Sequence, residues 1–131
     1  MPKLAILFVD DEAVILNSIL RQIQEEFDDR YIYETAENGE EALEVLDELH
    51  EEGTQVIIIV SDWLMPGMKG DELLVEVHRK FPGTVKILLT GQADEAAIER
   101  AQKEANLHHF IPKPWTKQEL INSIKSGIEK L

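Results

Sequence analysis

Side chains that could hold a metal ion and a phosphate group stand within two residues of the ends of four strand-like segments of the sequence. They are Asp10, Asp11, Asp62, Thr90 and Lys113. Carboxylates that lie close together repel, by about 4 kcal/mol for a pair about 4 Å apart when the effective dielectric constant is about 20. A proton or a divalent cation would relieve this repulsion, and a site of oxygen ligands suits Mg²⁺ or Mn²⁺ rather than zinc. These residues therefore indicate a metal-assisted site for phosphate-bearing ligands.

Phosphoryl transfer gives each of these residues a role. Asp62 is the best placed nucleophile because it follows the central strand, and a carboxylate can attack phosphorus to give an aspartyl phosphate. Lys113 would supply positive charge and Thr90 a hydroxyl donor, which suffices because this chemistry depends mainly on positioning and charge neutralisation. Taken alone, Asp10 or Asp11 would be read as a helix-capping residue, and the threonine and lysine as ordinary surface or strand-end residues. Their shared position after strands favours a single site.

Strand-like and helix-like segments alternate along the chain. The predicted strands are Leu4–Val9, Tyr31–Ala36, Gln55–Val60, Val85–Leu89 and His108–Ile111. The predicted helices are Glu12–Phe27, Glu40–His50, Asp71–Phe81, Asp94–Ala105 and one that begins at the capping box of Thr116 and Glu119. This alternation predicts an α/β fold with a parallel sheet covered on both faces by five helices. The polar residues after the strands would then meet at one edge of the sheet, where ligands bind in such folds.

The composition predicts one globular domain over residues 1–131. The chain has 13 basic and 26 acidic residues, a net charge of −13 that disfavours direct binding to nucleic acid. It contains no cysteine, so disulfides and thiolate metal sites are excluded. No apolar run is long enough to span a membrane, and the N-terminus lacks the cleavage site of a signal peptide. We therefore expect a cytoplasmic protein that does not contact the membrane.

The four histidines are not predicted to form a metal site. His108 and His109 are adjacent, so in a strand their side chains would point to opposite faces. His50 and His78 lie on predicted helices, where we expect them to be solvated.

Five stretches resemble the response-regulator receiver family of two-component signalling. They are FVDDE at 8–12, AENGEEAL at 36–43, SDWLMPGMKG at 61–70, LTG at 89–91 and IPKP at 111–114. The resemblance covers essentially the whole chain. It implies a flavodoxin-like receiver fold, with five parallel strands in the order 2-1-3-4-5 flanked by five helices.

The resemblance also implies the metal ligands. Asp62 would be the phosphoacceptor. Asp11 and Asp62 would bind Mg²⁺ directly, together with the backbone carbonyl of Leu64, and Asp10 would act largely through water.

Further roles follow from the second half of the family pattern. Thr90, the backbone N–H of Gly91 and Lys113 would hold phosphoryl oxygens. Thr90 and Phe110 would form the switch, although phenylalanine lacks the hydroxyl of the tyrosine that the family often carries there. The bond between Lys113 and Pro114 would be cis.

Three functions compete on this evidence. The first is a switch that a histidine kinase or phosphotransfer protein phosphorylates. Its surface of helix 4, strand 5 and helix 5 would regulate an output domain or a downstream protein, and the same surface could support a homodimer. The second is a metal-dependent phosphatase, which would place an Asp where Leu64 stands. The third is an unphosphorylated interaction module, which would have lost a site residue. The first is favoured, and such a receiver is not an enzyme in the usual sense because it acts only on itself.

Overall fold

The computed structural model describes residues 3–91 and 95–131 and has the predicted α/β fold. One parallel sheet has the strand order β2-β1-β3-β4-β5. The strands are β1 (Lys3–Val9), β2 (Ile32–Ala36), β3 (Thr54–Asp62), β4 (Val85–Thr90) and β5 (His109–Pro112). The helices are α1 (Ala13–Phe27), the short 3₁₀ helix η1 (Asp28–Arg30), α2 (Gly39–Glu51), α3 (Gly70–Lys80), α4 (Glu95–Glu104) and α5 (Lys117–Glu129).

The predicted strand order and helices are confirmed, whereas η1 was not predicted. The predicted start of the fourth helix, Asp94, lies outside the described residues.

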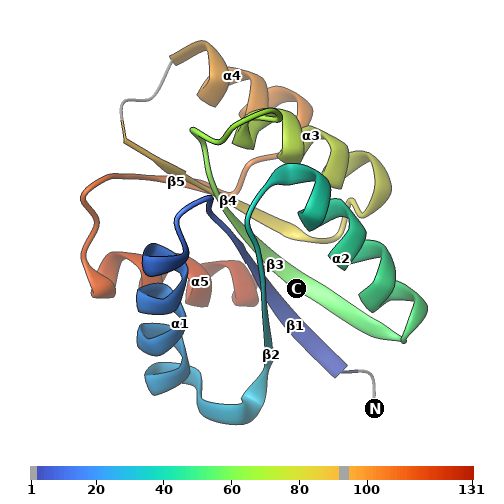
Figure 1. Cartoon of the computed structure of the whole chain (residues 1–131), viewed down its shortest axis with the longest axis vertical. Helices are drawn as coiled ribbons and strands as arrows, with labels where there is room; N and C mark the ends of the chain where they lie inside the picture. Colours follow the sequence, from blue (N-terminus) through green and yellow to red (C-terminus); the bar gives the residue numbers. More distant parts are fainter. Residues whose placement is uncertain (1–2, 92–94) are drawn as a thin grey trace.

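The sheet is covered on both faces, with α1 and α5 on one side and α2, α3 and α4 on the other (Figure 1). Strand side chains alternate between two apolar clusters. Ile6, Phe8 and Ile87 pack on the side of α1 and α5, and Leu7 and Leu88 pack on the opposite side. Burial on both faces explains why these strands are almost continuously apolar in sequence.

A bulge in β3 interrupts this alternation. Ala5 of β1 pairs with Val56, but the next residue, Ile6, pairs with Ile58, so Ile57 is an extra residue in β3. Ile57 and Ile58 consequently pack in the same apolar cluster, under α1 and α5. The bulge therefore sets which face each following residue of β3 occupies.

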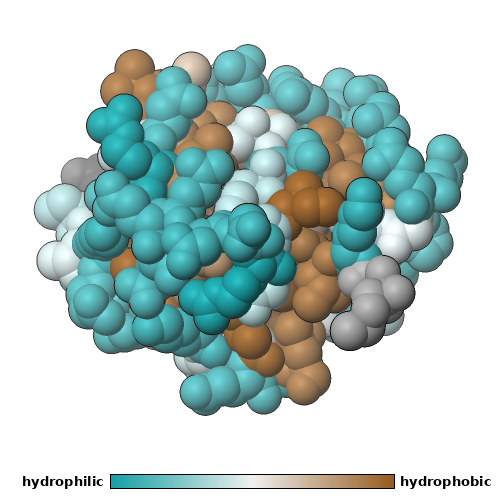
Figure 2. Space-filling view, turned by 90° about the horizontal axis from the view of Figure 1, so that it is seen from below, coloured by the Kyte–Doolittle hydropathy of each residue, from teal (hydrophilic) through white to brown (hydrophobic). Residues whose placement is uncertain are grey.

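The surface is mainly polar. Figure 2 views the end of the molecule where α1 ends and β2 begins, and shows hydrophilic residues around a central hydrophobic band. The large hydrophobic side chains that are exposed in the described part of the chain are Val14, Leu64, Phe110 and Leu131. No helix within residues 3–91 and 95–131 is both long and apolar enough to cross a membrane.

A lysine is fully buried in the middle layer of the fold. Lys86 of β4 is only 1% exposed. Its Nζ lies 2.8 Å from Nδ1 of His78 on α3 and donates a hydrogen bond to the carbonyl of Pro82 at 3.3 Å. Burial, with a smaller contribution from Lys130, lowers the pKa of Lys86 to about 8. His50 is exposed as expected, whereas His78 is only partly exposed, because its ring is the partner of the buried amine.

Replacing Lys86 by Met should change how stability depends on pH. The folded chain holds the Lys86 proton with a pKa of about 8 against an ordinary value of 10.5. Between these values the unfolded chain binds more protons, so the wild-type free energy of unfolding should rise with pH through this window. The full rise corresponds to about 3 kcal/mol. Urea unfolding of Lys86→Met across the window should lack this rise.

Lys80→Met is the matched control, because Lys80 is a half-exposed lysine at the end of α3 that pairs with Asp47. It should follow the wild-type pH curve. Parallel curves for wild type and Lys86→Met would contradict the assignment.

Candidate functional site

Three predicted acidic residues meet at the carboxyl edge of the sheet. Each offers one carboxylate oxygen, and these oxygens of Asp10, Asp11 and Asp62 all lie within 4.8 Å of one another. β1 and β3 are neighbours that pair Val9 with Ser61, which places the residues that follow them side by side. Asp10 and Asp62 are buried, whereas Asp11 is exposed. The fold therefore concentrates negative charge where the sequence predicted it.

Asp10 is the least compensated member of this cluster. Its Oδ1 accepts a hydrogen bond from the backbone N–H of Glu12 at 2.9 Å. Its Oδ2 is buried and has no hydrogen-bond partner in the described part of the protein. Burial raises the pKa of Asp10 to about 6; the hydrogen bond from Glu12 opposes this shift, and the negative charge of nearby Asp62 contributes to it. The N-cap of α1 is Glu12, without a side-chain cap, so Asp10 does not occupy the capping position.

Asp62 has a cation in contact. Nζ of Lys113 lies 2.8 Å from Oδ1 of Asp62. Burial raises the pKa of Asp62, and the hydrogen bond and charge of Lys113 oppose this shift. The same ammonium lies 5.8 Å from the centre of the Trp115 ring, a distance at which a cation is attracted to the ring face. Lys113 is therefore held between the carboxylate and an aromatic ring.

The ends of β4 and β5 position Lys113. Its backbone N–H donates to the carbonyl of Thr90, the last residue of β4. The bond between Lys113 and Pro114 is cis. Thr90 is buried. Phe110 lies on β5 opposite Leu88 and is 36% exposed.

The cluster opens into a cavity of about 630 Å³. Among the predicted site residues it is lined by Asp11, Asp62, Leu64, Gly91 and Lys113. Asp10 lies beneath it, within the acidic cluster. The cavity thus brings carboxylates, an ammonium group and two predicted backbone positions into one place.

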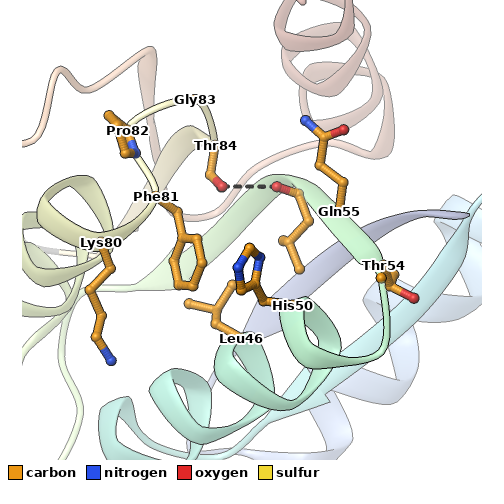
Figure 3. A pocket seen from close by; sticks show the side chains of 11 residues that line it. Leu46, His50, Thr54, Gln55, Lys80, Phe81, Pro82, Gly83 and Thr84 are labelled. Carbon is orange, nitrogen blue, oxygen red and sulfur yellow. Dashed lines mark hydrogen bonds between the residues drawn. The ribbon is translucent and has the colours of Figure 1, made fainter. Parts of the chain in front are cut away.

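A second cavity, of about 450 Å³, lies at the opposite end of β3 and contains none of the predicted site residues (Figure 3). The ring of His50 packs edge-on against Phe81, with ring centres 5.4 Å apart. The hydroxyl of Thr84 donates to the carbonyl of Val56 at 2.8 Å. The Thr84 hydroxyl and the Lys80 amine, which pairs with Asp47, already have partners, and the lining contains no carboxylate, so this cavity is the weaker candidate.

The expectation that the side chains of His108 and His109 point to opposite faces was wrong. Their ring centres lie 6.3 Å apart, and both rings reach α5, where ring nitrogens lie 3.0 Å from the Ser126 hydroxyl and 3.2 Å from the Ser123 hydroxyl. His108 precedes β5, so strand alternation does not apply to it.

Sequence reasoning also missed Asp71. Nε1 of Trp63, the residue after Asp62, donates to Oδ1 of Asp71 at 3.0 Å. An acidic residue in the first turn of a helix is ordinary in sequence, because it complements the helix dipole. Nothing in the spacing distinguished Asp71 from Glu72 beside it.

Comparison with known proteins gives a consistent result. The family model described as the response regulator receiver domain matches residues 6–125. The hydrogenase transcriptional regulatory protein HoxA of Cupriavidus necator is 33% identical over 95% of this chain, which spans 24% of that protein. The sensor kinase CckA of Brucella abortus is 34% identical over 95% of this chain, which spans 12% of that protein. The signal receiver domain of an HD domain-containing protein from Pseudomonas fluorescens Pf-5 has a TM-score of 0.86 at 30% identity, covering 98% of this chain and 96% of that one.

Asp10→Asn should stabilise the metal-free protein at neutral pH. The folded pKa of Asp10, about 6, lies above its ordinary value of 3.8, so wild-type stability should fall as pH rises through this window. Asn cannot ionise and can still accept from Glu12. We expect a gain of up to about 3 kcal/mol at neutral pH that vanishes below the ordinary pKa. Urea unfolding in a chelating buffer measures this gain, and Asp29→Asn, at an exposed position, is the control. Destabilisation at neutral pH would contradict it.

Proposed function

Because the chain belongs to the response regulator receiver domain family, we propose that it is a phosphorylatable switch in which Asp62 accepts the phosphoryl group. Receiver domains are signalling domains of two-component systems. The observation that carries the proposal is the contact of 2.8 Å between Lys113 and Asp62 beside two further carboxylates. A nucleophile, a cation and an unneutralised acidic cluster thus share one open cavity.

The residues present fit a bound Mg²⁺, or Mn²⁺ in its place. The donor set consists of oxygen atoms, and one buried oxygen of Asp10 has no partner among the residues that the structure describes. We assign Asp11, Asp62 and the carbonyl of Leu64 as ligands, with Asp10 acting through water. When bound, the ion would neutralise the carboxylates and the charge of the incoming phosphate.

The reaction we propose is a direct displacement at phosphorus. A carboxylate oxygen of Asp62 forms the new O–P bond, while the bond between phosphorus and a donor histidine nitrogen breaks and that nitrogen keeps the electron pair. Lys113 then turns from the Asp62 carboxylate to a phosphoryl oxygen. The N–H of Gly91 and the hydroxyl of Thr90 hold the other oxygens, because positioning and charge neutralisation dominate this chemistry.

The residue at position 64 bears on whether the site could act as a phosphatase with repeated turnover. A phosphatase with an aspartyl-phosphate intermediate would need an acidic group at this position, and Leu64 supplies a side chain that is 64% exposed and cannot donate a proton. We therefore propose a switch that is phosphorylated stoichiometrically, with no further substrate.

The partners we propose are a histidine kinase or phosphotransfer protein as donor, and an output domain or downstream protein as reader. The surface of α4, β5 and α5 would carry the signal through Thr90 and the exposed Phe110, and could also support a homodimer. Residues 1–131 would form a single receiver domain in the cytoplasm, and the net charge of −13 argues against direct contact with nucleic acid.

Acetyl phosphate with Mg²⁺ should add the mass of one phosphoryl group to the wild-type chain. Asp62→Asn should abolish this addition, because an amide oxygen is a poor nucleophile, and chelation of the metal should slow it. Intact-protein mass spectrometry measures both effects. Asp47→Asn, a half-exposed aspartate on α2, should label like wild type. A label that persists in Asp62→Asn would refute the assignment.

A further inference from the structure

The residue after Asp62 is fixed at three points. The backbone N–H of Trp63 donates to the carbonyl of Leu89 at 2.9 Å, and the N–H of Gly70 donates to the Trp63 carbonyl at 2.9 Å. The indole Nε1 donates to Oδ1 of Asp71 at 3.0 Å. The first bond attaches Trp63 to β4, and the other two attach it to the start of α3. The backbone next to the acidic cluster is therefore tied to two neighbouring elements.

Asp71 is the buried partner in this arrangement. It is 6% exposed, and its Oδ2 lies 3.7 Å from Nη1 of Arg100 on α4. Arg100 is itself oriented by a hydrogen bond from its Nε to Glu104 at 3.0 Å. A buried carboxylate must be compensated by hydrogen bonds or charge. Here one oxygen faces the indole and the other faces a guanidinium group on a different helix.

The start of α3 packs closely against the backbone of residues 62 and 63. A Cβ added to Gly70 would lie 2.3 Å from the carbonyl oxygen of Asp62 and 2.8 Å from Cα of Trp63. The first turn of α3 therefore touches the backbone of the phosphoacceptor directly. Any displacement of Asp71 would be passed to residues 62 and 63, and so to the carbonyl of Leu64 one position further on.

We propose that Asp71 is a positioning residue for the metal site. Through the indole of Trp63 it fixes the backbone that presents the Leu64 carbonyl, and through Arg100 it connects this backbone to α4. This inference rests on the proposed function, because it assumes that the acidic cavity binds Mg²⁺. It assigns to Asp71 a part in metal binding although its side chain lies outside the acidic cluster.

The test compares Mg²⁺ affinity with stability. Isothermal titration calorimetry would measure the Mg²⁺ dissociation constant, and urea unfolding would measure the stability of each variant. Asp71→Leu and Trp63→Phe remove the same hydrogen bond from its two ends. Both should weaken Mg²⁺ binding about tenfold, the low end of the effect of losing a group that orients a metal ligand. The double variant should be no weaker than the single ones.

Two further variants separate positioning from other effects. Asp71→Asn keeps an oxygen that can accept from the indole, so it should restore wild-type affinity. Glu72→Leu removes an exposed acid from the same turn of α3 and should leave the affinity unchanged. If Asp71→Leu does not fold, the Mg²⁺ affinity of Trp63→Phe tests the proposal, because this variant keeps an aromatic ring for packing and removes only the indole donor.

The outcomes also separate this inference from the proposed function. Wild-type Mg²⁺ affinity in Trp63→Phe and Asp71→Leu overturns the positioning role, even if Asp62 is labelled by acetyl phosphate. Equal weakening by Glu72→Leu overturns it as well, since the effect would then be one of net charge. A wild-type chain that binds no Mg²⁺ and takes no label overturns both.

Discussion

Repulsion among the carboxylates of Asp10, Asp11 and Asp62 is the constraint that organises the carboxyl edge of the sheet. Three carboxylate oxygens lie within 4.8 Å of one another, and Lys113 contacts only one of these residues directly. Burial raises the pKa of both Asp10 and Asp62, so the cluster is destabilising when all its members are ionised. The apolar strands hold these groups together in spite of this cost. The proposed cation site therefore lowers the stability of the metal-free protein.

Much of this edge could be predicted from the sequence, because continuous apolar runs alternating with amphipathic helices admit few arrangements. Once the strands are parallel, the residues that follow them must converge, and Asp10 and Asp62 did. The order of the strands came only from the family resemblance. The packing of His108 could not be predicted, because it depends on whether β5 begins at residue 108 or 109. The hydrogen bond between Asp71 and the Trp63 indole could not be predicted either, because an acidic residue in the first turn of a helix has the same local sequence pattern whether it is exposed or buried.

Lys86 shows a different limit of sequence reasoning. A lysine among Val, Ile and Leu normally keeps its amine in water by extending along the surface. In a sheet covered on both faces this route is closed, and the amine instead meets His78 and the carbonyl of Pro82. Its partners come from α3 and the loop that follows, so burial of the charge depends on tertiary packing that no pattern within β4 reveals. Its position near the amino end of β4 also keeps it apart from the acidic cluster.

The extra residue in β3 has a consequence for recombining this chain with its relatives. Ile57 divides the strand into two halves whose side chains follow opposite alternation, and Asp62 belongs to the second half. A hybrid that joined the first half from one parent to the second half of another, and lost the bulge at the junction, would turn Asp62 toward the wrong face. A crossover point that preserves the orientation of Asp62 should therefore take Val56, Ile57 and Ile58 from the same parent.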